Sequence, residues 1–510
     1  ASPIGTSVTL DYATLTGLRN ETSNIIYFRG IPFADPPIGE LRWRAPVSPP
    51  TRQLGNIDTS SFANTCIATT QQAATPGTSE DCLFGNVNIP VDTRIGDKLP
   101  VMVWFHGGGF QSGSTHDAPP DFLIQASTQP MIFVSFEYRL GQFGFLGGSQ
   151  IKGNGTLNAG LLDQRAALRW VRRYIGNFGG DANRVTIWGE SAGAGSTMFQ
   201  LIANSGNNEG LFHAAMGDSP SLSFVPGFSE PYVENIFMQF ASFAGCGNLG
   251  EQTLACLRSA STATLTLAGS QTIAARPATL FVFAPIMDGE FIRERPVEAF
   301  ASGDFAMVPV LFGSNTNEGA NWSASLKDAS ANTSMPNATE QTVFNFIRGQ
   351  YPNFTEAAFM QGTSQYAEQN FNDSFSLQGQ QMYGEARYIC TAELITAAMR
   401  KKGVPAFQFH YDNPNLGSNH GSDLMAFFSP PPNNANADDV ALFTAMQEYW
   451  TSFVTTRQPT AQNSPIWVPV SNIEGGPRLL LRPGQISMEE EGGTLSAHCS
   501  FWHGMSEQIR

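Results

Sequence analysis

The chain has no long apolar segment and an excess of negative over positive charge. None of its apolar runs approaches the ~20 residues that a helix needs to cross a bilayer. Lysine and arginine number 28 against 43 aspartate and glutamate residues, which gives the 510-residue chain a formal net charge of −15. A surface of that sign repels nucleic acid and anionic lipid. We therefore predict no membrane span and no nucleic-acid partner.

Cysteine is also scarce, and its spacing disfavours a metal site. The six cysteines include no Cys-x-x-Cys pair and no cluster with histidine. Neither a bound metal nor a cofactor is therefore predicted. An even number of cysteines is compatible with disulfides, which form in oxidising compartments. Six cysteines allow many pairings, and their spacing alone does not choose among them.

No linker or internal repeat divides the chain. A Pro/Asn-rich stretch at 429–439 is short and is interpreted as a surface loop. Strand-like apolar runs alternate with helical stretches, which favours a mainly parallel sheet covered by helices on both faces. Length alone would allow three domains, but large α/β enzymes also fold as one unit. We predict a single α/β domain over residues 1–510.

The most informative motif is a Gly-x-Ser-x-Gly sequence centred on Ser191. An apolar run at 185–188 enters it, and a helix-like stretch at 194–203 follows. This order is typical of a nucleophile elbow, a strained strand-to-helix turn that exposes the serine hydroxyl. The short motif alone also describes ordinary tight turns. The strand before it and the helix after it are the context that a catalytic serine requires, so Ser191 is predicted to be a nucleophile.

A glycine-rich loop supplies a second part of the same site. Residues 99–105 predict a buried strand, and three consecutive glycines, 107–109, follow shortly after it. Glycine allows close approach of a backbone to a substrate because no Cβ intervenes. A merely flexible loop is the alternative. Together with the serine turn, the loop predicts an oxyanion hole made by the backbone N–H groups of Gly108, Gly109 and Ala192.

One of the seven histidines is placed as a catalytic base would be. His420 lies in a polar loop just after a strand-like run at 406–411. A loop histidine is usually only solvated, but the chain order serine, acid, histidine favours this one. An ordinary imidazole would make activity rise with pH around a pKa of about 6.5. The other histidines lie in the glycine loop, near predicted helices, within a strand or near the C-terminus: His106, His116, His213, His410, His498 and His503.

The acid that orients this base is expected between Ser191 and His420. A buried-strand run at 308–312 is followed by a loop whose only carboxylate is Glu318. Glu318 would accept the Nδ1 proton of His420, fix its tautomer and stabilise the imidazolium. Asp288 is the alternative, although the Asp-Gly pair that it begins is typical of a turn.

Short segments along nearly the whole chain match one known family. They are FRGIPFA at 28–34, LRWRAP at 41–46, SEDCL at 79–83, YRLG at 138–141, FGFL at 143–146, residues 158–164 and FGGD at 178–181, together with the glycine loop and the serine turn. With them the chain resembles the type-B carboxylesterase/lipase family, the cholinesterase-related branch of the α/β-hydrolases. The resemblance implies an α/β-hydrolase fold, the triad Ser191, Glu318 and His420, and a secreted protein of fungal type.

The resemblance implies three further features of the structure. A glutamate just before the nucleophile, here Glu190, would tune the charge near the site. Two structural ion pairs are implied, Arg44 with Glu80 and Arg139 with Asp181. The cysteines would pair as Cys66–Cys82, Cys246–Cys256 and Cys390–Cys499.

The start of the chain and its N-glycosylation sequons are compatible with secretion. The chain begins without a signal peptide and is interpreted as a mature form from which the signal was removed. Chance would give nearly as many sequons in a chain this rich in asparagine, serine and threonine, so they do not discriminate. They begin at Asn20, Asn154, Asn321, Asn332, Asn337, Asn353 and Asn372.

Two functional classes are open for such a chain. The resemblance implies hydrolysis of a small or lipid-like ester through an acyl-enzyme, but related folds also serve as non-catalytic binding proteins. Those relatives generally lose a triad member, whereas this chain keeps all three residues. An ester hydrolase is therefore predicted.

The segment between Cys66 and Cys82 bears on the choice of ester. Lipases of this family carry a long amphipathic lid there, whereas residues 67–81 of this chain hold one large apolar residue and no aromatic. Such a segment offers neither an apolar face for a lipid interface nor a cation–π wall for choline. We expect an open esterase for soluble or medium-chain esters. The alternative is a true lipase or sterol esterase with its lid elsewhere, such as 224–243. Residues 424–428 are a candidate pocket wall, or else core.

Overall fold

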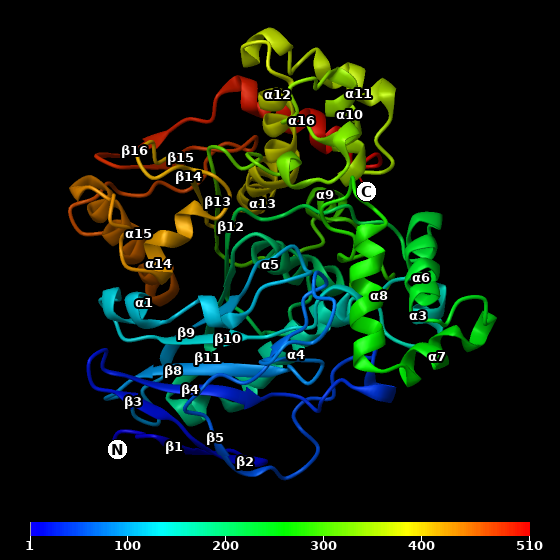
Figure 1. Cartoon of the computed structure of the whole chain (residues 1–510). Coiled ribbons are helices and arrows are strands. Elements are labelled where there is room, and N and C mark those ends of the chain that lie inside the picture. Colours follow the sequence, from blue (N-terminus) through cyan, green and yellow to red (C-terminus); the bar gives the residue numbers. More distant parts are fainter. Residues whose placement is uncertain (1, 510) are drawn as a thin grey trace.

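The structure is a computed structural model that describes residues 2–509, and a large twisted sheet runs through it (Figure 1). All strands from β15 to β10 are parallel, and the strands at both edges are antiparallel. The expected mainly parallel α/β sheet is therefore confirmed. In order across the sheet the strands are β16 (Gln485–Glu489), β15 (Arg478–Arg482), β14 (Ala406–Tyr411), β13 (Val310–Asn315), β12 (Ala214–Asp218), β11 (Gly180–Gly189), β9 (Leu99–Phe105), β10 (Ile132–Phe136), β8 (Phe84–Pro90), β4 (Ile25–Pro32) and β3 (Leu18–Asn20).

Helices connect these strands and cover both faces of the sheet (Figure 1). In chain order they are α1 (Asp121–Ala126), α2 (Gly141–Gly144), α3 (Ser149–Asn154), α4 (Ala159–Tyr174), α5 (Ala192–Ile202), α6 (Pro231–Phe243), α7 (Thr253–Ser259), α8 (Thr262–Ala274), α9 (Pro296–Ser302), α10 (Glu340–Gln350), α11 (Glu356–Thr363), α12 (Phe375–Gly384), α13 (Cys390–Lys401), α14 (Met425–Phe428), α15 (Ala437–Thr456) and α16 (Gly493–Gly504).

The two faces of the sheet carry separate hydrophobic clusters, because successive side chains of a strand point to opposite sides. In β9, Val101 and Val103 pack with residues of α4, α5 and α13. Met102 and Trp104 pack on the other side with residues of α1, α14 and α15. Every residue of β9 is buried, which is the pattern of a central parallel strand covered on both faces.

Two smaller sheets complete the strands. One joins β1 (Ser7–Thr9), β2 (Ala13–Thr16) and β5 (Gly55–Asp58) near the N-terminus. The other pairs β6 (Thr65–Cys66) with β7 (Thr78–Ser79) across the base of the loop that a disulfide closes.

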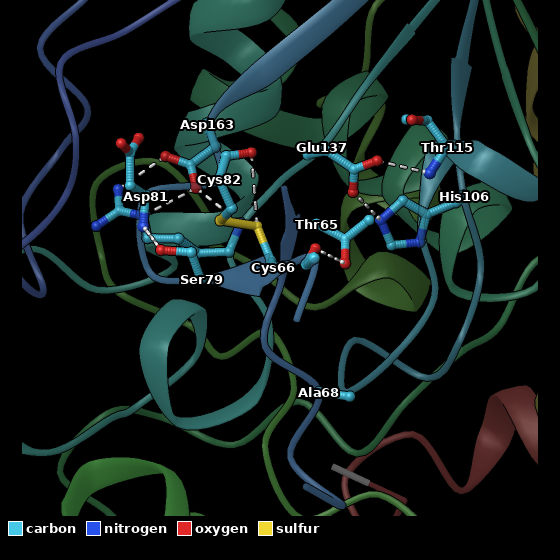
Figure 2. Close-up of a disulfide and its surroundings, with 12 residues drawn as sticks. Thr65, Cys66, Ala68, Ser79, Asp81, Cys82, His106, Thr115, Glu137 and Asp163 are labelled. Atoms are coloured by element: carbon cyan, nitrogen blue, oxygen red, sulfur yellow. Dashed lines mark hydrogen bonds and ion pairs between the residues drawn. A yellow bond between two sulfur atoms is a disulfide. The ribbon is translucent and has the colours of Figure 1, made fainter. Parts of the chain in front are cut away.

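Three disulfides are present, and they are the three that the family resemblance implies. Figure 2 shows Cys66–Cys82 beside Ser79 and Thr65, at the neck of the short loop. The other two bonds join Cys246 to Cys256 and Cys390 to Cys499, with sequence separations of 10 and 109 residues.

The two structural ion pairs implied by the resemblance were each predicted with one wrong residue. Glu80 pairs with Arg42 at 2.7 Å, whereas Arg44 donates to the carbonyl of Glu40. The backbone between the two arginines is left-handed at Trp43, with φ 51°. Arg42 is consequently buried and Arg44 is left partly exposed.

The second correction concerns Arg139, which pairs with Asp163 of α4 at 2.7 Å. Asp163 is fully buried and also accepts from the backbone N–H of Arg139 at 2.9 Å. Asp181 lies in β11 where the register with β9 is irregular, and its carboxylate accepts from the nearby N–H of Asn183 instead.

Within residues 2–509 no helix combines the length and apolarity that a bilayer crossing requires.

Candidate active site

The strand-to-helix turn at Ser191 has the geometry of a strained elbow. β11 ends at Gly189, and α5 begins at Ala192, so Ser191 lies on the turn between them. Its backbone dihedrals are φ 57° and ψ −121°, a region that non-glycine residues rarely adopt. The N–H of Ser191 donates to the carbonyl of Asp218 on neighbouring β12 at 3.0 Å, which holds the turn in place.

The two glycines of the motif are required by close packing. A Cβ at Gly189 would lie 2.3 Å from the carbonyl carbon of Gly193. A Cβ at Gly193 would lie 2.0 Å from the carbonyl oxygen of Phe105. The elbow therefore lies so close to the end of β9 that neither glycine could carry a side chain. This contact brings Ser191 next to the glycine loop.

The glycine loop is anchored from below by buried polar groups. Tyr138 donates its hydroxyl to the carbonyl of His106 at 2.6 Å. Figure 2 shows that His106 faces Glu137, and Nε2 of His106 lies 3.9 Å from Oε2 of Glu137. Burial raises the pKa of Glu137 to about 7 and lowers the pKa of His106 to about 4. Both shifts favour the uncharged form of a buried group, so burial acts against charge at the base of the loop.

The amides predicted to form an oxyanion hole are free to bind a substrate. Within residues 2–509, the backbone N–H groups of Gly108, Gly109 and Ala192 donate no hydrogen bond. Gly108 and Gly109 have φ values of 112° and 64°, which glycine adopts readily. A Cβ at Gly109 would lie 2.0 Å from the ring of Phe281. The structure thus gives a reason for glycine at both positions.

The three residues predicted as a triad meet in space although they are far apart in the chain. The Oγ of Ser191 lies 2.7 Å from Nε2 of His420. The Nδ1 of His420 lies 2.5 Å from Oε2 of Glu318. These are hydrogen-bond distances, and their order is that of a nucleophile, a base and an orienting acid.

Glu318 is fully buried at the end of β13, and its second oxygen is also bound. Oε1 accepts from the backbone N–H of Asn315 at 2.7 Å and from the hydroxyl of Ser219. These donors fix the carboxylate, so that Oε2 is directed at His420. Asn315 in turn donates to the carboxylate of Asp423, at 3.0 Å.

A second carboxylate faces the histidine from the elbow itself. Oε1 of Glu190 lies 3.4 Å from Nε2 of His420. Burial lowers the pKa of His420, but the negative charges of Glu190 and Glu318 outweigh it and raise the pKa above the ordinary imidazole value. Burial raises the pKa of Glu190, and the positive charge of protonated His420 acts against this rise. The expectation of an unperturbed imidazole is therefore corrected upward.

Two aspartates beneath the triad share a buried site that the sequence does not reveal. Asp218 and Asp423 are both fully buried. Asp218 accepts from the indole N–H groups of Trp188 and Trp450 at 2.9 and 3.2 Å. Burial and the neighbouring carboxyl group raise the pKa of Asp218 well above its usual range. The pKa of Asp423 is raised by burial as well, so simultaneous ionisation of the two carboxyl groups is disfavoured.

Aromatic rings enclose His420 on its other sides. Tyr388 lies 4.2 Å and Trp322 5.4 Å from its imidazole ring, measured between centroids. The indole N–H of Trp322 donates to the carbonyl of Glu318 at 2.9 Å. Neither ring was predicted from the sequence. Trp322 follows Glu318 by four residues and was a detectable signal, whereas Tyr388 comes from a distant helical segment and had none.

The remaining candidates lie elsewhere. Asp288 accepts from Asn158 and from the N–H groups of Glu290 and Ile292 in a turn. It has no contact with His420 within residues 2–509. Met425–Phe428 form α14 and pack in a hydrophobic cluster with tryptophans such as Trp188, with 5.3 Å between the rings of Trp188 and Phe427. This packing favours the core alternative for residues 424–428.

No group of histidine, cysteine, aspartate and glutamate suited to holding a metal ion occurs in residues 2–509.

Comparison with known proteins places the whole chain in one family. The Carboxylesterase family model matches residues 5–502. Lipase 4 of Diutina rugosa is 40% identical over 349 residues, which are 62% of this chain and 62% of that protein. The chain thus spans just under two thirds of that relative. Secreted lipase 1 of Botryotinia fuckeliana is 30% identical over 518 residues, covering 93% of this chain and 88% of that protein.

A solved structure agrees with the sequence comparisons. The crystal structure of Aspergillus niger EstA superimposes with a TM-score of 0.87 at 30% identity, over 99% of this chain and 98% of that one. The fold is accordingly that of the α/β-hydrolases, as the sequence predicted. With a family match from residue 5 to residue 502, the chain belongs to the carboxylesterase family.

Proposed function

We propose that this protein hydrolyses carboxylic esters through an acyl-enzyme on Ser191. His420 acts as the general base and Glu318 as the orienting acid. One observation carries the proposal: an unbroken hydrogen-bond path from Ser191 Oγ to His420 Nε2 at 2.7 Å and from His420 Nδ1 to Glu318 Oε2 at 2.5 Å. Membership of the carboxylesterase family supports it.

The reaction proceeds in two halves. Ser191 Oγ attacks the ester carbonyl while its proton passes to Nε2 of His420, and the carbonyl oxygen becomes negative opposite the amides of Gly108, Gly109 and Ala192. The alcohol leaves with the proton from Nε2. In the second half His420 takes a proton from water, the hydroxide attacks the acyl carbon, and Ser191 recovers its proton as the acid is released.

The loop closed by Cys66 and Cys82 supports an open esterase. Residues 67–81 are short, and their one large apolar residue, Ile67, is buried. The loop is held by the backbone N–H of Thr69, which donates to the carbonyl of Gln111 at 2.8 Å. The Phe-rich alternative at 224–243 is mostly packed in the core, although Phe243 is 41% exposed. We therefore propose soluble or medium-chain esters and secretion, the latter with the support of secreted relatives.

A non-catalytic binding role is the less favoured alternative. It would leave the strained Ser191, the three free amides and the triad contacts without a purpose.

Replacing the nucleophile tests the proposal directly. Ser191→Ala should lower kcat on p-nitrophenyl butyrate by more than about 10³-fold while the circular dichroism spectrum stays unchanged. A fluorophosphonate should label Ser191 in the wild-type protein and no other serine. Hydrolysis by the alanine variant at more than about one thousandth of the wild-type rate would contradict the assignment.

A further inference from the structure

Arg387 is a buried cation close to the proposed active site. It is 3% exposed and lies in a π-helical turn, Glu385–Ile389, between α12 and α13. Within residues 2–509 its guanidinium forms no ion pair, and Nε has no hydrogen-bond partner. A buried charge of this kind is costly unless something compensates it. Irregular π-turns within helices are frequent at functional sites.

The other buried arginines all have an oxygen acceptor. Three of them pair with carboxylates, Arg42 with Glu80, Arg139 with Asp163 and Arg295 with Glu298, while Arg165 lies 3.4 Å from Glu209 and Arg258 donates to backbone carbonyls. Arg387 has neither a carboxylate nor a carbonyl acceptor in the described chain, and the oxygens beside its guanidinium are the hydroxyls of Tyr351 and Tyr388. The rings around it are those of Phe281 at 4.9 Å, Tyr388 at 5.8 Å and Tyr383 at 6.0 Å. Burial raises the pKa of both phenols, so they remain neutral and do not cancel the charge.

The guanidinium borders a narrow cavity that contains a second unpartnered polar group. Ser223 lines the same cavity, and its buried Oγ has no hydrogen-bond partner among residues 2–509. The other walls are mainly apolar and include Phe224, Phe281 and Val282. The free volume is about 30 Å³, and roughly 10–15 Å³ suffices for one water. The cavity therefore has room for the two oxygens of a carboxylate.

The cavity adjoins the glycine loop of the proposed active site. Phe281, one of its walls, packs so closely on Gly109 that a Cβ there would lie 2.0 Å from the ring. The backbone of Arg387 is also tied to the elbow, because its carbonyl accepts from Leu222 and the N–H of Ser221 donates to the carbonyl of Ser191 at 3.3 Å. The rings that pack on His420 are those of Tyr388 and Trp322, and neither residue lines the cavity. Because His420 would protonate the leaving alcohol, the cavity is assigned to the acyl side of the proposed reaction.

We propose that Arg387 and Ser223 bind a carboxylate at the far end of the acyl chain, so that the preferred substrates are half-esters of dicarboxylic acids. The proposal rests on the ester hydrolysis proposed above and adds the acid part of the substrate. An acyl group attached to Ser191 would run past Phe281 toward Arg387. A planar guanidinium binds a carboxylate through two parallel N–H bonds, and Ser223 would donate a third.

The test compares charged and neutral acyl chains of equal length. The mono-p-nitrophenyl esters of adipic, pimelic and suberic acid are measured against p-nitrophenyl hexanoate, heptanoate and octanoate. At one chain length the wild-type protein should prefer the half-ester in kcat/KM by about ten- to hundredfold, the range that hydrogen bonds to a charged group provide. The difference should appear mainly in KM. No preference at any length would overturn the proposal.

Variants assign the preference to Arg387. Arg387→Met should abolish the ratio between half-ester and neutral ester, and Arg387→Lys should keep part of it. Arg348→Met is the matched control, because it removes an exposed arginine that also lies over a ring, that of Phe344 at 5.9 Å. Its ratio should equal that of the wild type. An unchanged ratio in Arg387→Met would refute the subsite. If Arg387→Met does not fold, Ser223→Ala is measured in its place. Ser223→Ala should lower the ratio between half-ester and neutral ester, and an unchanged ratio in that variant would also refute the subsite.

Direct binding separates this proposal from the proposed reaction. Monomethyl suberate should bind Ser191→Ala in isothermal titration calorimetry, whereas methyl octanoate, which has no carboxylate, should bind at least about tenfold more weakly. Equal binding of the two esters would refute the carboxylate subsite even if esters are hydrolysed by the wild-type protein. Tighter binding of monomethyl suberate without any ester hydrolysis by the wild-type protein would support the subsite and contradict the proposed reaction.

Discussion

At the scale of single residues, the catalytic proposal depends on how each carboxylate is bound. Glu318 is fixed by two donors on Oε1 and faces His420 with Oε2. Asp288 has its oxygens occupied in a turn. The two acids that the sequence offered for one role are thus separated by their hydrogen bonds.

Exchanging each acid for its amide should distinguish them. Glu318→Gln should lower kcat on the order of 10⁴-fold, the loss known when a triad acid becomes an amide, because it no longer stabilises the correct imidazole tautomer. Asp288→Asn should leave kcat essentially unchanged, since it lies in a turn outside the triad. Steady-state kinetics at one pH, with thermal melting as a folding control, decides between them. The opposite ranking would assign the acid role to Asp288.

The pH profile should report on Glu190. Activity requires neutral His420, so it rises with pH through the pKa of that imidazole, which Glu190 and Glu318 together raise above the usual value. Glu190→Gln removes one of these charges and should move the rising limb of kcat/KM to lower pH. A limb that stays in place or moves to higher pH would show that Glu190 does not act on His420 electrostatically.

At the scale of elements, the loop closed by Cys66 and Cys82 sets the expected substrate. Gln71 ties it together internally, because its amide contacts Ala73, Thr75 and Thr78. A loop that is bound in this way and has no exposed aromatic offers no apolar face to lipid.

The rate on tributyrin should therefore show no step at its solubility limit. Initial rates are measured in a pH-stat while the concentration passes from solution to emulsion, with p-nitrophenyl butyrate as the soluble reference. A smooth saturation curve is expected, because no lid has to open at an interface. A sharp rise once the emulsion forms would make the protein a lipase, and 224–243 the first segment to examine as its lid.

At the scale of the whole molecule, we propose that residues 1–510 form one domain. The strands of the large sheet come from Leu18 through Glu489, so no shorter portion of the chain would complete it. The Cys390–Cys499 bond links α13 to α16 across 109 residues of sequence, and this segment contains strands β14, β15 and β16 of the large sheet.

This long-range bond should contribute more to stability than the shortest one. In the chain-entropy relation, a loop of about 100 residues is worth roughly 4.7 kcal/mol and one of about 15 residues roughly 3 kcal/mol. Cys390→Ala/Cys499→Ala should accordingly lower the melting temperature more than the matched pair Cys246→Ala/Cys256→Ala. Calorimetry at equal scan rates makes the comparison. Equal losses, or a larger loss in the short loop, would contradict it.

The sequence by itself determined the motifs whose chemistry is local. The glycines around Ser191 and in the 107–109 loop, the buried run of β9 and the strand at 406–411 are all patterns of neighbouring residues, and the structure has the elements that they predict. Even the position of Glu318 followed from a strand end, because parallel strands deliver their carboxyl ends to one edge of a sheet.

Only the tertiary structure decided which distant groups meet. Arg42, and not Arg44, reaches Glu80 because a single left-handed residue turns the backbone between them. The paired Asp218 and Asp423, the ring of Tyr388 on His420 and the unpaired charge of Arg387 arise from strands and helices far apart in the chain. Burial and ion pairing depend on what packs against a side chain, and that contact is fixed by the fold as a whole and not by local sequence.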